Sequence, residues 1–342
     1  MENFYYIALK TFGIFVRFLP APLAMHLGRL LGILVYFFDI KHRSIASANL
    51  KVAFAKIKTP AEIKKITKQF FVNYGLNLIE VFRLPLMNRE NFDRYIKMEG
   101  RENITEALAK KKGVILLAMH FGSWEMASLS SAMMEHPYKV IVNPQKRYSK
   151  LDDLLNSYRS CGGNVVLSRG LGTREMIKSL QNNELIGLVA DQGGRDGVLV
   201  PFFERQASMS SGAIRLGLKF DVPICFSIIV RDKGGANHRL IIHPPLKLIN
   251  TGNVDQDVAA NLNEIVKIME EYIRKYPAEY MWFYKIWKYS RESNIVILDD
   301  GRTGHLRQSQ AAAAMIRRTL ADSAQQIQSE TAVIHIRFKS KF

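Results

Sequence analysis

The sequence is short of cysteine, of acidic residues and of uninterrupted apolar runs. Its 342 residues include only Cys161 and Cys225, too few for a disulfide scaffold or a cysteine-rich zinc site. We interpret both as free thiols of a reducing compartment, because no histidine lies near Cys161 in sequence to activate it. No small-residue cleavage site follows a short apolar segment, which argues against a removed signal peptide.

Acidic residues are outnumbered by basic ones. The 31 Asp and Glu stand against 48 Lys and Arg, a formal net charge of +17. Such a chain is attracted to polyanions, which include nucleic acid, anionic lipid surfaces and phosphorylated substrates. Because the sequence has no zinc-finger spacing, no KH-type loop and no RNP-like aromatic strand, we expect no nucleic-acid partner.

The first forty residues are strongly apolar but broken. Charged residues and two prolines, Pro20 and Pro22, divide "FYYIALKTFGIFVRFLPAPLAMHLGRLLGILVYFFDI", so neither half has 18 uninterrupted apolar residues. Apolar helices followed by cations are typical of the cytoplasmic face of a membrane, where each cation contributes about 1 kcal/mol. We therefore expect residues 1–40 to be membrane-associated helices, with a spanning helix the less favoured form. A helical hairpin packed on the rest of the domain, with a solvated basic face, is the alternative. The basic residues that follow are Lys41, Arg43, Lys51, Lys56, Lys58, Lys64, Lys65 and Lys68.

Short apolar runs then alternate with helical segments. The runs "GVILLAM", "YKVIVN", "NVVLS", "LIGLVA", "PICFSIIV" and "HRLIIHP" predict buried strands. Helices are predicted from Thr59 as N-cap with Pro60 in the first position, and over 124–134, 148–160, 172–181, 210–219 and 254–275. We predict an α/β domain over residues 41–292, with a mixed, largely parallel sheet flanked by helices. In such sheets ligands gather at the carboxyl ends of the strands.

A separate pattern begins after Glu292. "SNIVILDDGRTGHLRQSQAAAAMIRRTL" predicts a strand, a glycine-containing turn and a helix, and "AVIHIRF" predicts a second strand. Residues 293–342 hold too few elements to bury a normal core. We interpret them as a partial α/β tail that belongs to a larger second domain.

One histidine stands where an α/β sheet usually carries its reactive groups. In "LLAMHFGSWEMASL", His120 ends a predicted strand, Gly122 gives the turn backbone freedom, and Glu125 falls in the first turn of the next helix. A carboxylate on one imidazole nitrogen makes the other a better base for a hydroxyl proton, and backbone N–H groups at a helix start can meet an oxyanion. The alternative reading is a core histidine. No GxSxG, HExxH or Walker A sequence indicates a different chemistry.

Several motifs share a resemblance to one family. "HFGSWE" resembles the HxxxxD/E motif of membrane-associated acyltransferases, and the match extends to their late lipid A (lauroyl/myristoyl) branch over about the first 290 residues. The further segments that carry it are "RSIASANLKVAF", "LSRGLGTREMIKSLQNNE", "ADQGGRDGVLVPFFERQASMSSGAIRLG" and "YPAEYMWFYKIWK". The family often has paired arginines after Trp282, whereas this chain has Phe283, Tyr284 and Lys285. The tail "ILDDGRTGHLRQSQ" is similar to the start of a glycosyltransferase-like family named for a mitochondrial fission factor.

The resemblance implies a role for each matched residue. It makes His120 the general base and Glu125 its orienting partner, with no metal at the site. Asp191 and Gln192 follow the strand "LIGLVA" and are expected to position the acceptor or support the site. The resemblance implies phosphate or acyl-carrier binding for two arginines, Arg169 and Arg195, because a guanidinium fork suits phosphate oxygens. Gly122 is counted with these substrate-binding residues.

The function implied is that of a membrane-associated O-acyltransferase. It is expected to move a fatty acyl group from a thioester, acyl carrier protein or acyl-coenzyme A, to a hydroxyl of a lipid A precursor or related glycolipid, with no bound cofactor. The expected location is the cytoplasmic face of a bacterial inner membrane, with an anionic membrane surface as partner. The alternatives are a lysophospholipid acyltransferase of the glycerol-phosphate type and a non-catalytic basic membrane-binding protein. The sequence leaves the donor, the acyl chain length and the acceptor open.

Overall fold

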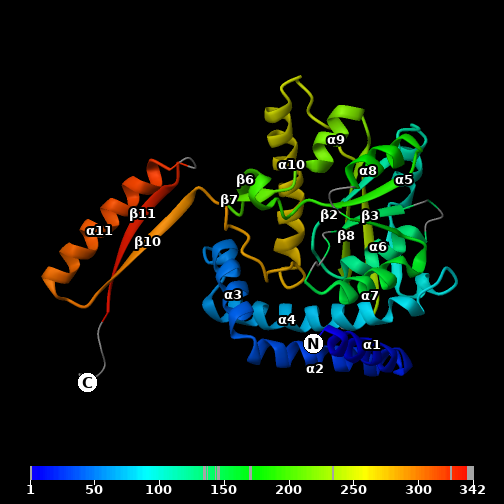
Figure 1. Cartoon of the computed structure of the whole chain (residues 1–342), viewed down its shortest axis with the longest axis horizontal. Helices are drawn as coiled ribbons and strands as arrows, with labels where there is room; N and C mark the ends of the chain where they lie inside the picture. The colour runs from blue at the N-terminus through cyan, green and yellow to red at the C-terminus, as the bar shows by residue number, and fades with distance from the viewer. Residues whose placement is uncertain are drawn as a thin grey trace.

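A seven-stranded sheet forms the centre of the molecule (Figure 1). The computed structural model describes residues 2–133, 136, 138–142, 144, 147–168, 172–232, 235–323 and 326–336. The strands of this sheet are β1 (Ile96–Glu99), β2 (Val114–Ala118), β3 (Tyr138–Val142), β4 (Val165–Ser168), β5 (Leu185–Val189), β8 (Ile224–Arg231) and β9 (His238–Pro245). They lie in the order β1-β9-β8-β2-β5-β3-β4, and every neighbouring pair is parallel except β8 and β9. The predicted mixed, largely parallel sheet is confirmed, while the short strand β1 was not predicted.

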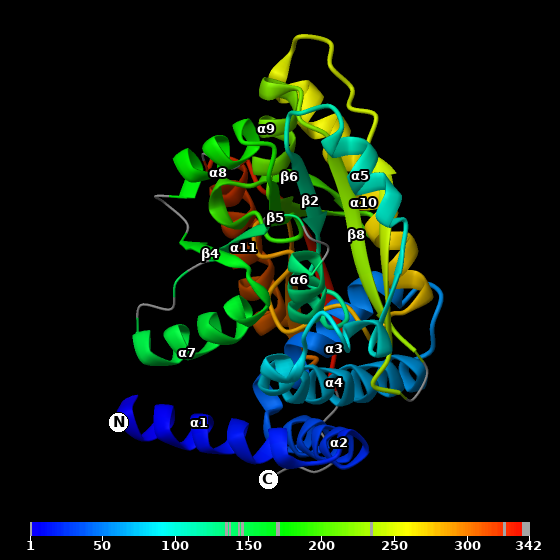
Figure 2. The same ribbon diagram turned by 90° about the vertical axis from the view of Figure 1, so that its right-hand side faces the viewer.

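Strand β2 is apolar throughout because the sheet is covered on both faces. Ile115 and Leu117 point into one hydrophobic cluster, and Val114 and Leu116 point into another. The first cluster contains residues of α8 (Gly172–Gln181), α9 (Gly212–Phe220) and α10 (Val254–Lys275). The second contains residues of α5 (Arg101–Leu108), α6 (Trp124–Ala132) and α7 (Ser149–Arg159). Figure 2 shows these helices arranged around the strands.

Four helices precede the sheet. They are α1 (Glu2–Phe18), α2 (Ala21–Phe38), α3 (Ile40–Phe54) and α4 (Pro60–Arg83). The start of α4 is the predicted one: the Thr59 hydroxyl accepts from the backbone N–H of Glu62 at 3.3 Å, and the Glu62 carboxylate accepts from the Thr59 N–H at 2.8 Å. This capping box satisfies two backbone donors that the helix itself leaves free.

Helices α2 and α4 pack backbone against backbone. A Cβ at Gly32 would lie 2.3 Å from the carbonyl oxygen of Phe71, and one at Gly75 would lie 2.3 Å from that of Gly28. Glycine at these crossing points therefore allows an approach that any larger residue would prevent. Helices α1 and α2 form the outermost layer at the bottom of Figure 1, beneath α4.

The outer surface of α1 and α2 is apolar. Phe18 is 83% exposed and Phe38 81% exposed. Among the described residues, α2 is the helix that is long and apolar enough to cross a membrane by length and composition. The structure thus combines packing of α2 on the domain, as in the hairpin alternative, with an exposed apolar face. The large apolar side chains exposed on these two helices are Phe4, Tyr5, Ile7, Leu9, Ile14, Phe15, Phe18, Leu23, Leu30, Leu34, Phe37 and Phe38.

A small hairpin that the sequence did not predict lies beside the main sheet. Strands β6 (Val198–Phe202) and β7 (Arg205–Met209) pair antiparallel around the two-residue turn Phe203–Glu204. Both turn residues have positive φ, +49° and +65°, which two-residue hairpins require but which normally selects glycine, asparagine or aspartate. Phe203 is held by burial in the core.

The tail has the predicted strand, helix and strand. These are β10 (Glu292–Asp299), α11 (Thr303–Ala321) and β11 (Gln328–His335). The two strands pair parallel with each other in a sheet of their own, which Figure 1 shows at the left of the main body. Short 3₁₀ turns complete the described elements: η1 (Leu84–Leu86), η2 (Phe92–Arg94), η3 (Ser160–Gly162) and η4 (Gly194–Asp196).

Candidate active site

Backbone contacts with neighbouring segments fix the turn that follows β2. Gly122 has a φ of +55°, and a Cβ there would lie 2.3 Å from the carbonyl oxygen of Ile229. The Gly122 N–H donates to the Glu279 carbonyl at 2.9 Å, and the Met281 N–H donates to the His120 carbonyl at 3.0 Å. The expected need for glycine in this turn is confirmed, since a side chain would meet the neighbouring strand.

The carboxylate on the His120 ring comes from the strand next to β2. Nδ1 of His120 lies 2.9 Å from Oδ1 of Asp191, and the His120 backbone N–H donates to Oδ2 at 3.3 Å. Strands β2 and β5 are parallel neighbours, so their carboxyl ends bring these residues together. The side-chain amide nitrogen of Gln192 lies 3.3 Å from the same ring nitrogen. Because a carboxylate only accepts, Nδ1 carries the hydrogen and Nε2 is left as the basic nitrogen.

Glu125 does not orient this ring, so that prediction is wrong. Its carboxylate accepts from Nε of Arg159 at 2.8 Å and also pairs with the Nη2 of the same guanidinium. Arg159, the last residue of α7, also donates to the side chain of Asn156 at 3.0 Å. The first turn of α6 therefore directs Glu125 toward α7. Asp191 makes the contact with the His120 ring that we expected Glu125 to make. Sequence analysis missed Arg159.

The electrostatics of the pair favour the charged form of the ring. Burial alone would lower the pKa of His120, but the charge and hydrogen bond of Asp191 outweigh it and raise that pKa above its ordinary value. Glu125 raises the pKa of the ring further and Arg159 opposes this. The His120 side chain is 24% exposed, and its Nε2 makes no hydrogen bond with any residue that the structure describes.

The buried Tyr280 and the partly buried Tyr284 support Asp191 from behind. The Tyr284 hydroxyl donates to the Asp191 carbonyl oxygen at 2.7 Å, and the Tyr280 hydroxyl lies 2.7 Å from that of Tyr284. Burial, with the nearby Asp191 charge, raises the pKa of both phenols well above the ordinary value. They are therefore neutral hydrogen-bonding groups at physiological pH. Sequence analysis did not assign a role to either tyrosine, although both stand in the motif that contains Trp282.

Asparagines of the N-terminal helices fix the segment that carries these tyrosines. Asn49 of α3 donates to the carbonyls of Trp282 and Tyr284 at 2.9 and 2.7 Å. Asn73 of α4 donates to the Ala278 carbonyl at 3.1 Å. The early motif "RSIASANLKVAF" and the closing motif "YPAEYMWFYKIWK" therefore meet in space, and their contact supports the site from outside it.

A cavity of about 700 Å³ opens beside the His120 ring. Trp124 packs edge-on to the ring with centroids 5.5 Å apart, and it lines the cavity together with Arg159 and Gln192. The wall carries both polar and apolar side chains. Its apolar members include Val140, Ile141, Leu155, Met176, Leu188, Ala213, Leu216 and Ile228. A space of this size and lining fits a flexible apolar chain with a polar reacting end.

The other residues predicted to bind substrate do not line the cavity or lie outside the described residues. Arg195 is exposed in η4 and is not among the residues that line the cavity, although its neighbour Asp196 is. Arg169 lies outside the described residues. Gly122 is not among the residues that line the cavity, and its backbone contacts Glu279 and Ile229; its substrate-binding role stays a prediction. The binding roles of Arg195 and Arg169 stay predictions.

Comparison with known proteins gives a family for most of the chain. Residues 3–289 match the family model described as bacterial lipid A biosynthesis acyltransferase. The matched part ends just before β10 and so leaves the tail outside.

Three curated relatives match between 43% and 82% of this chain. The lipid A biosynthesis lauroyltransferase of Escherichia coli (strain K12) is 26% identical over 273 residues, 79% of this chain and 87% of the relative. The lipid A biosynthesis palmitoleoyltransferase of the same organism is 23% identical over 287 residues, 82% of this chain and 91% of the relative. A phosphatidylinositol mannoside acyltransferase of Mycobacterium tuberculosis (strain CDC 1551 / Oshkosh) is 29% identical over 157 residues, 43% of this chain and 48% of the relative.

Proposed function

The chain belongs to the bacterial lipid A biosynthesis acyltransferase family and is an O-acyltransferase, and we propose that it moves a fatty acyl group from a thioester to a hydroxyl of a lipid A precursor or related glycolipid. The observation that carries this proposal is the His120–Asp191 pair at the edge of a cavity of about 700 Å³. A base with one free nitrogen beside an apolar space suits the deprotonation of an alcohol next to an acyl chain.

The first step is a proton transfer to His120. With Nδ1–H donated to Asp191, Nε2 takes the proton of the acceptor hydroxyl as the alcohol oxygen attacks the thioester carbonyl. The buried Asp191 carboxylate holds the ring orientation and stabilises the imidazolium that forms. The raised pKa of His120 supports this role, because a stronger base takes a hydroxyl proton more readily.

The second step breaks the carbon–sulfur bond. The tetrahedral intermediate carries a negative oxygen, and the backbone N–H groups in the first turn of α6 are donors without partners in the helix itself. When the intermediate collapses, the thiolate leaves and takes the proton from Nε2–H. An ester and a free thiol result, and His120 returns to its starting state.

Glu125 remains a proposed functional residue with a different task. Its bidentate pair with Arg159 fixes the guanidinium at the cavity wall. We propose that Arg159 meets an anionic oxygen of the substrate, the role that the family resemblance implies for Arg169 and Arg195. Gln192, which lines the cavity next to the ring, is proposed to contact the acceptor.

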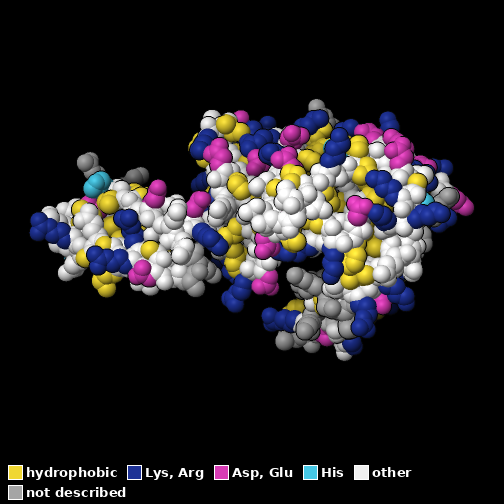
Figure 3. Space-filling model, turned by 90° about the horizontal axis from the view of Figure 1, so that it is seen from above, with side chains coloured by type: hydrophobic (Ala, Val, Ile, Leu, Met, Phe, Trp, Pro, Cys, Tyr) yellow, Lys and Arg dark blue, Asp and Glu magenta, His cyan; other side chains and the backbone are white. Residues whose placement is uncertain are grey.

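The acceptor reaches the site from an anionic membrane surface. Helix α7 lines the cavity with Asp152 and Leu155 and also touches α1, where the Glu2 carboxylate accepts from the Lys150 backbone N–H at 2.8 Å. One wall of the cavity therefore belongs to a helix that packs directly against α1. The surface opposite the exposed apolar face of α1 and α2, seen from above in Figure 3, mixes acidic and basic side chains. This contrast supports docking through α1 and α2 at the cytoplasmic side of the inner membrane. The net charge of +17 also suits a phosphate-bearing donor, acyl carrier protein or acyl-coenzyme A.

We also propose the domain division 1–40, 41–292 and 293–342. The separate two-stranded sheet of the tail supports the last boundary. The exposed apolar faces of α1 and α2 support the first.

The proposal is tested by transfer assays on the whole chain. Purified protein is incubated with acyl carrier protein thioester or acyl-coenzyme A and with a lipid A precursor or phosphatidylinositol mannoside, and mass spectrometry detects a product heavier by one acyl group. His120→Ala should abolish the product while vesicle binding is kept. Product from lysophosphatidic acid alone would indicate a lysophospholipid acyltransferase, and equal product with His120→Ala would overturn the mechanism. Vesicle binding without transfer to any acceptor would indicate a non-catalytic binder.

A further inference from the structure

A buried ion pair lies directly behind the catalytic turn. Arg231 of β8 pairs with Glu80 of α4 through both arms of its guanidinium, one of them at 2.8 Å. The two side chains are 4% and 5% exposed. Burying two charges is costly, and such a pair adds little net stability compared with apolar residues of the same size. A pair in this position therefore calls for an explanation other than stability.

Asn77 connects the pair to the turn. Its side-chain oxygen accepts from Nη2 of Arg231 at 2.5 Å, and its side-chain nitrogen donates to the Gly122 carbonyl at 2.7 Å. An amide has one accepting and one donating end, so the guanidinium on the oxygen turns the nitrogen toward Gly122. Glu80 fixes Arg231, Arg231 fixes Asn77, and Asn77 fixes the turn two residues after His120.

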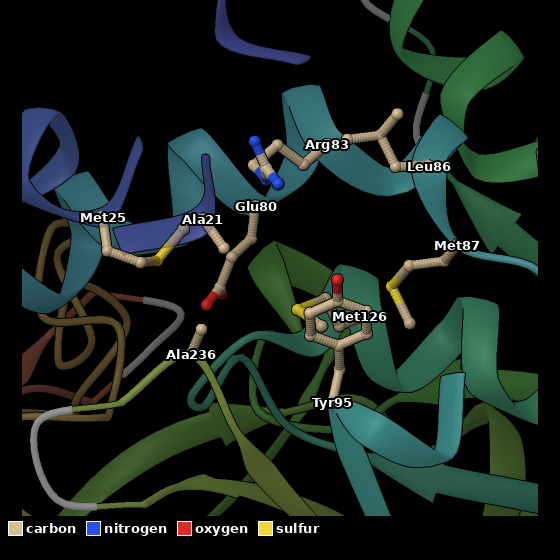
Figure 4. A pocket seen from close by; sticks show the side chains of 9 residues that line it. All are labelled: Ala21, Met25, Glu80, Arg83, Leu86, Met87, Tyr95, Met126 and Ala236. Atoms are coloured by element: carbon tan, nitrogen blue, oxygen red, sulfur yellow. The ribbon is translucent and has the colours of Figure 1, made fainter. Parts of the chain in front are cut away.

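These three residues do not reach the substrate. Asn77, Glu80 and Arg231 are absent from the lining of the cavity beside His120. On its other side Glu80 borders a separate cavity of about 30 Å³, room for about one water, where Figure 4 shows its carboxylate pointing from α4 toward Ala236. Asn77 therefore contacts the turn from behind and does not meet the space beside His120.

We infer that Asn77, oriented by the Arg231–Glu80 pair, is a positioning residue that holds the 120–122 turn so that Nε2 of His120 faces the acceptor hydroxyl. This inference rests on the proposed function. The turn is also tied to the closing segment through the Glu279 and Met281 backbones, so the loss of one anchor should loosen it rather than release it. A loosened base lowers the rate of the chemical step and leaves substrate binding largely intact.

Asn77→Ala and Asn77→Asp test the inference. Each should lower kcat by roughly 10- to 100-fold with the KM of donor and acceptor changed less than about 3-fold. Asn77→Asp keeps the shape of the side chain but cannot donate to the Gly122 carbonyl. Asn261→Ala is the matched control, because Asn261 is likewise a buried asparagine that holds a backbone segment, through Ile249, on the distant helix α10. It should leave kcat within about 3-fold of the parent.

A second variant covers the case in which the Asn77 variants fail to fold. Glu80→Leu combined with Arg231→Met removes both charges together, a change that proteins commonly tolerate. Asn77 is then free to rotate, and kcat should fall by roughly 3- to 10-fold, again with little change in KM. Folded Asn77 variants that keep kcat within 3-fold, or a loss as large in Asn261→Ala, would overturn the inference.

A measurement that needs no turnover separates this inference from the proposed function. The pKa of the His120 ring is followed by NMR titration in the full chain, with His120→Ala used for assignment. In Asn77→Ala the ring should shift from its raised pKa toward the ordinary value, because its fixed position beside Asp191 relaxes. An unchanged titration contradicts the inference even if the chain transfers no acyl group, and a shifted one supports it in the same case.

Discussion

Asp191 accepts a hydrogen bond from Nδ1 of His120 at 2.9 Å, although the two residues are 71 positions apart in sequence. They meet because β2 and β5 are adjacent parallel strands and each residue follows the end of its own strand. The nearer carboxylate in sequence, Glu125, is bound to Arg159 instead. The partner of the base is therefore set by the strand order, and the spacing of the HxxxxE motif does not reveal it.

Asp191→Asn should lower kcat/KM by roughly 100- to 1,000-fold, because an amide no longer fixes the tautomer or stabilises the charged ring. The acidic limb of the pH profile should also move. The base works in its deprotonated form, so activity rises as pH increases through the pKa of His120, which Asp191 raises. Without that carboxylate the limb should shift to lower pH, as measured by steady-state kinetics across pH.

Asp196→Asn is the control for this variant, because Asp196 lines the same cavity but does not touch the ring. It should leave the acidic limb in place. An Asp191→Asn enzyme with the parent pH profile would contradict the assignment of Asp191 as the partner of the base.

Glu125→Gln should affect stability and substrate binding more than the titration of the base. Removing one member of a largely buried ion pair leaves the other charge unpaired, so the free energy of unfolding should fall by roughly 3 kcal/mol. Denaturation of Glu125→Gln, Arg159→Met and the double variant would measure the coupling between the two residues. A shift of the acidic limb as large as that in Asp191→Asn would restore Glu125 as the partner of His120.

The regular elements could be predicted from the sequence because local pattern determines them. Helices α8 and α10 run over the predicted residues 172–181 and 254–275, and α4 starts at its predicted cap. The role of Gly122 could be predicted for the same reason, since a tight turn after a strand often needs a residue with positive φ. Patterns of this kind lie within one turn or one strand of the chain, so no tertiary information is needed to read them.

The missed features depend on tertiary packing. The β6–β7 hairpin turns on Phe203 and Glu204, which carry no turn signal and are held in positive φ because Phe203 is buried. Arg159 reaches Glu125 only because α7 lies across the start of α6, and no spacing between them encodes that. The sequence places Asp191 at the correct edge of the sheet. It does not show that Asp191 rather than Glu125 contacts the His120 ring, because that depends on the direction in which each side chain points from its strand or helix.

Glu279→Gln should change how stability depends on pH. Burial raises the pKa of Glu279 to about 7, partly offset by Arg231 and reinforced by Glu80. The unfolded chain ionises this carboxyl near its ordinary value of 4.5, so the folded state loses stability as pH rises from about 4.5 to 7. The glutamine variant avoids this loss. The difference in free energy of unfolding between the variant and the parent should therefore be more favourable to the variant at pH 8 than at pH 4, by up to roughly 3 kcal/mol.

Urea denaturation at pH values between 4 and 8 measures this difference. Glu62→Gln is a control at an exposed carboxylate whose pKa is lowered. The parent loses the contribution of Glu62 as pH falls, and the glutamine variant avoids that loss, so the difference from the parent should have the opposite sign. A Glu279→Gln variant with the same pH dependence as the parent would mean that Glu279 ionises normally in the folded protein.

Replacing the most exposed phenylalanines of the N-terminal helices should weaken membrane binding. Phe18 and Phe38 are 83% and 81% exposed, so their replacement disturbs no core packing. Burial of one such side chain in a bilayer contributes about 1.5–3 kcal/mol, and every 1.4 kcal/mol is tenfold in affinity. Phe18→Ser combined with Phe38→Ser should therefore weaken binding at least about tenfold. Co-sedimentation with vesicles of phosphatidylethanolamine and phosphatidylglycerol would measure it.

Val254→Ser on α10 is the matched control, since Val254 is 53% exposed but lies outside α1 and α2. It should bind vesicles like the parent. Acyl transfer to a detergent-dispersed acceptor should be unchanged in the double serine variant, because the cavity and the His120–Asp191 pair do not include either phenylalanine. Transfer to an acceptor embedded in vesicles should fall together with binding, because the cavity would then meet the bilayer less often. If both variants bound vesicles as tightly as the parent, the apolar face of α1 and α2 would not be the docking surface.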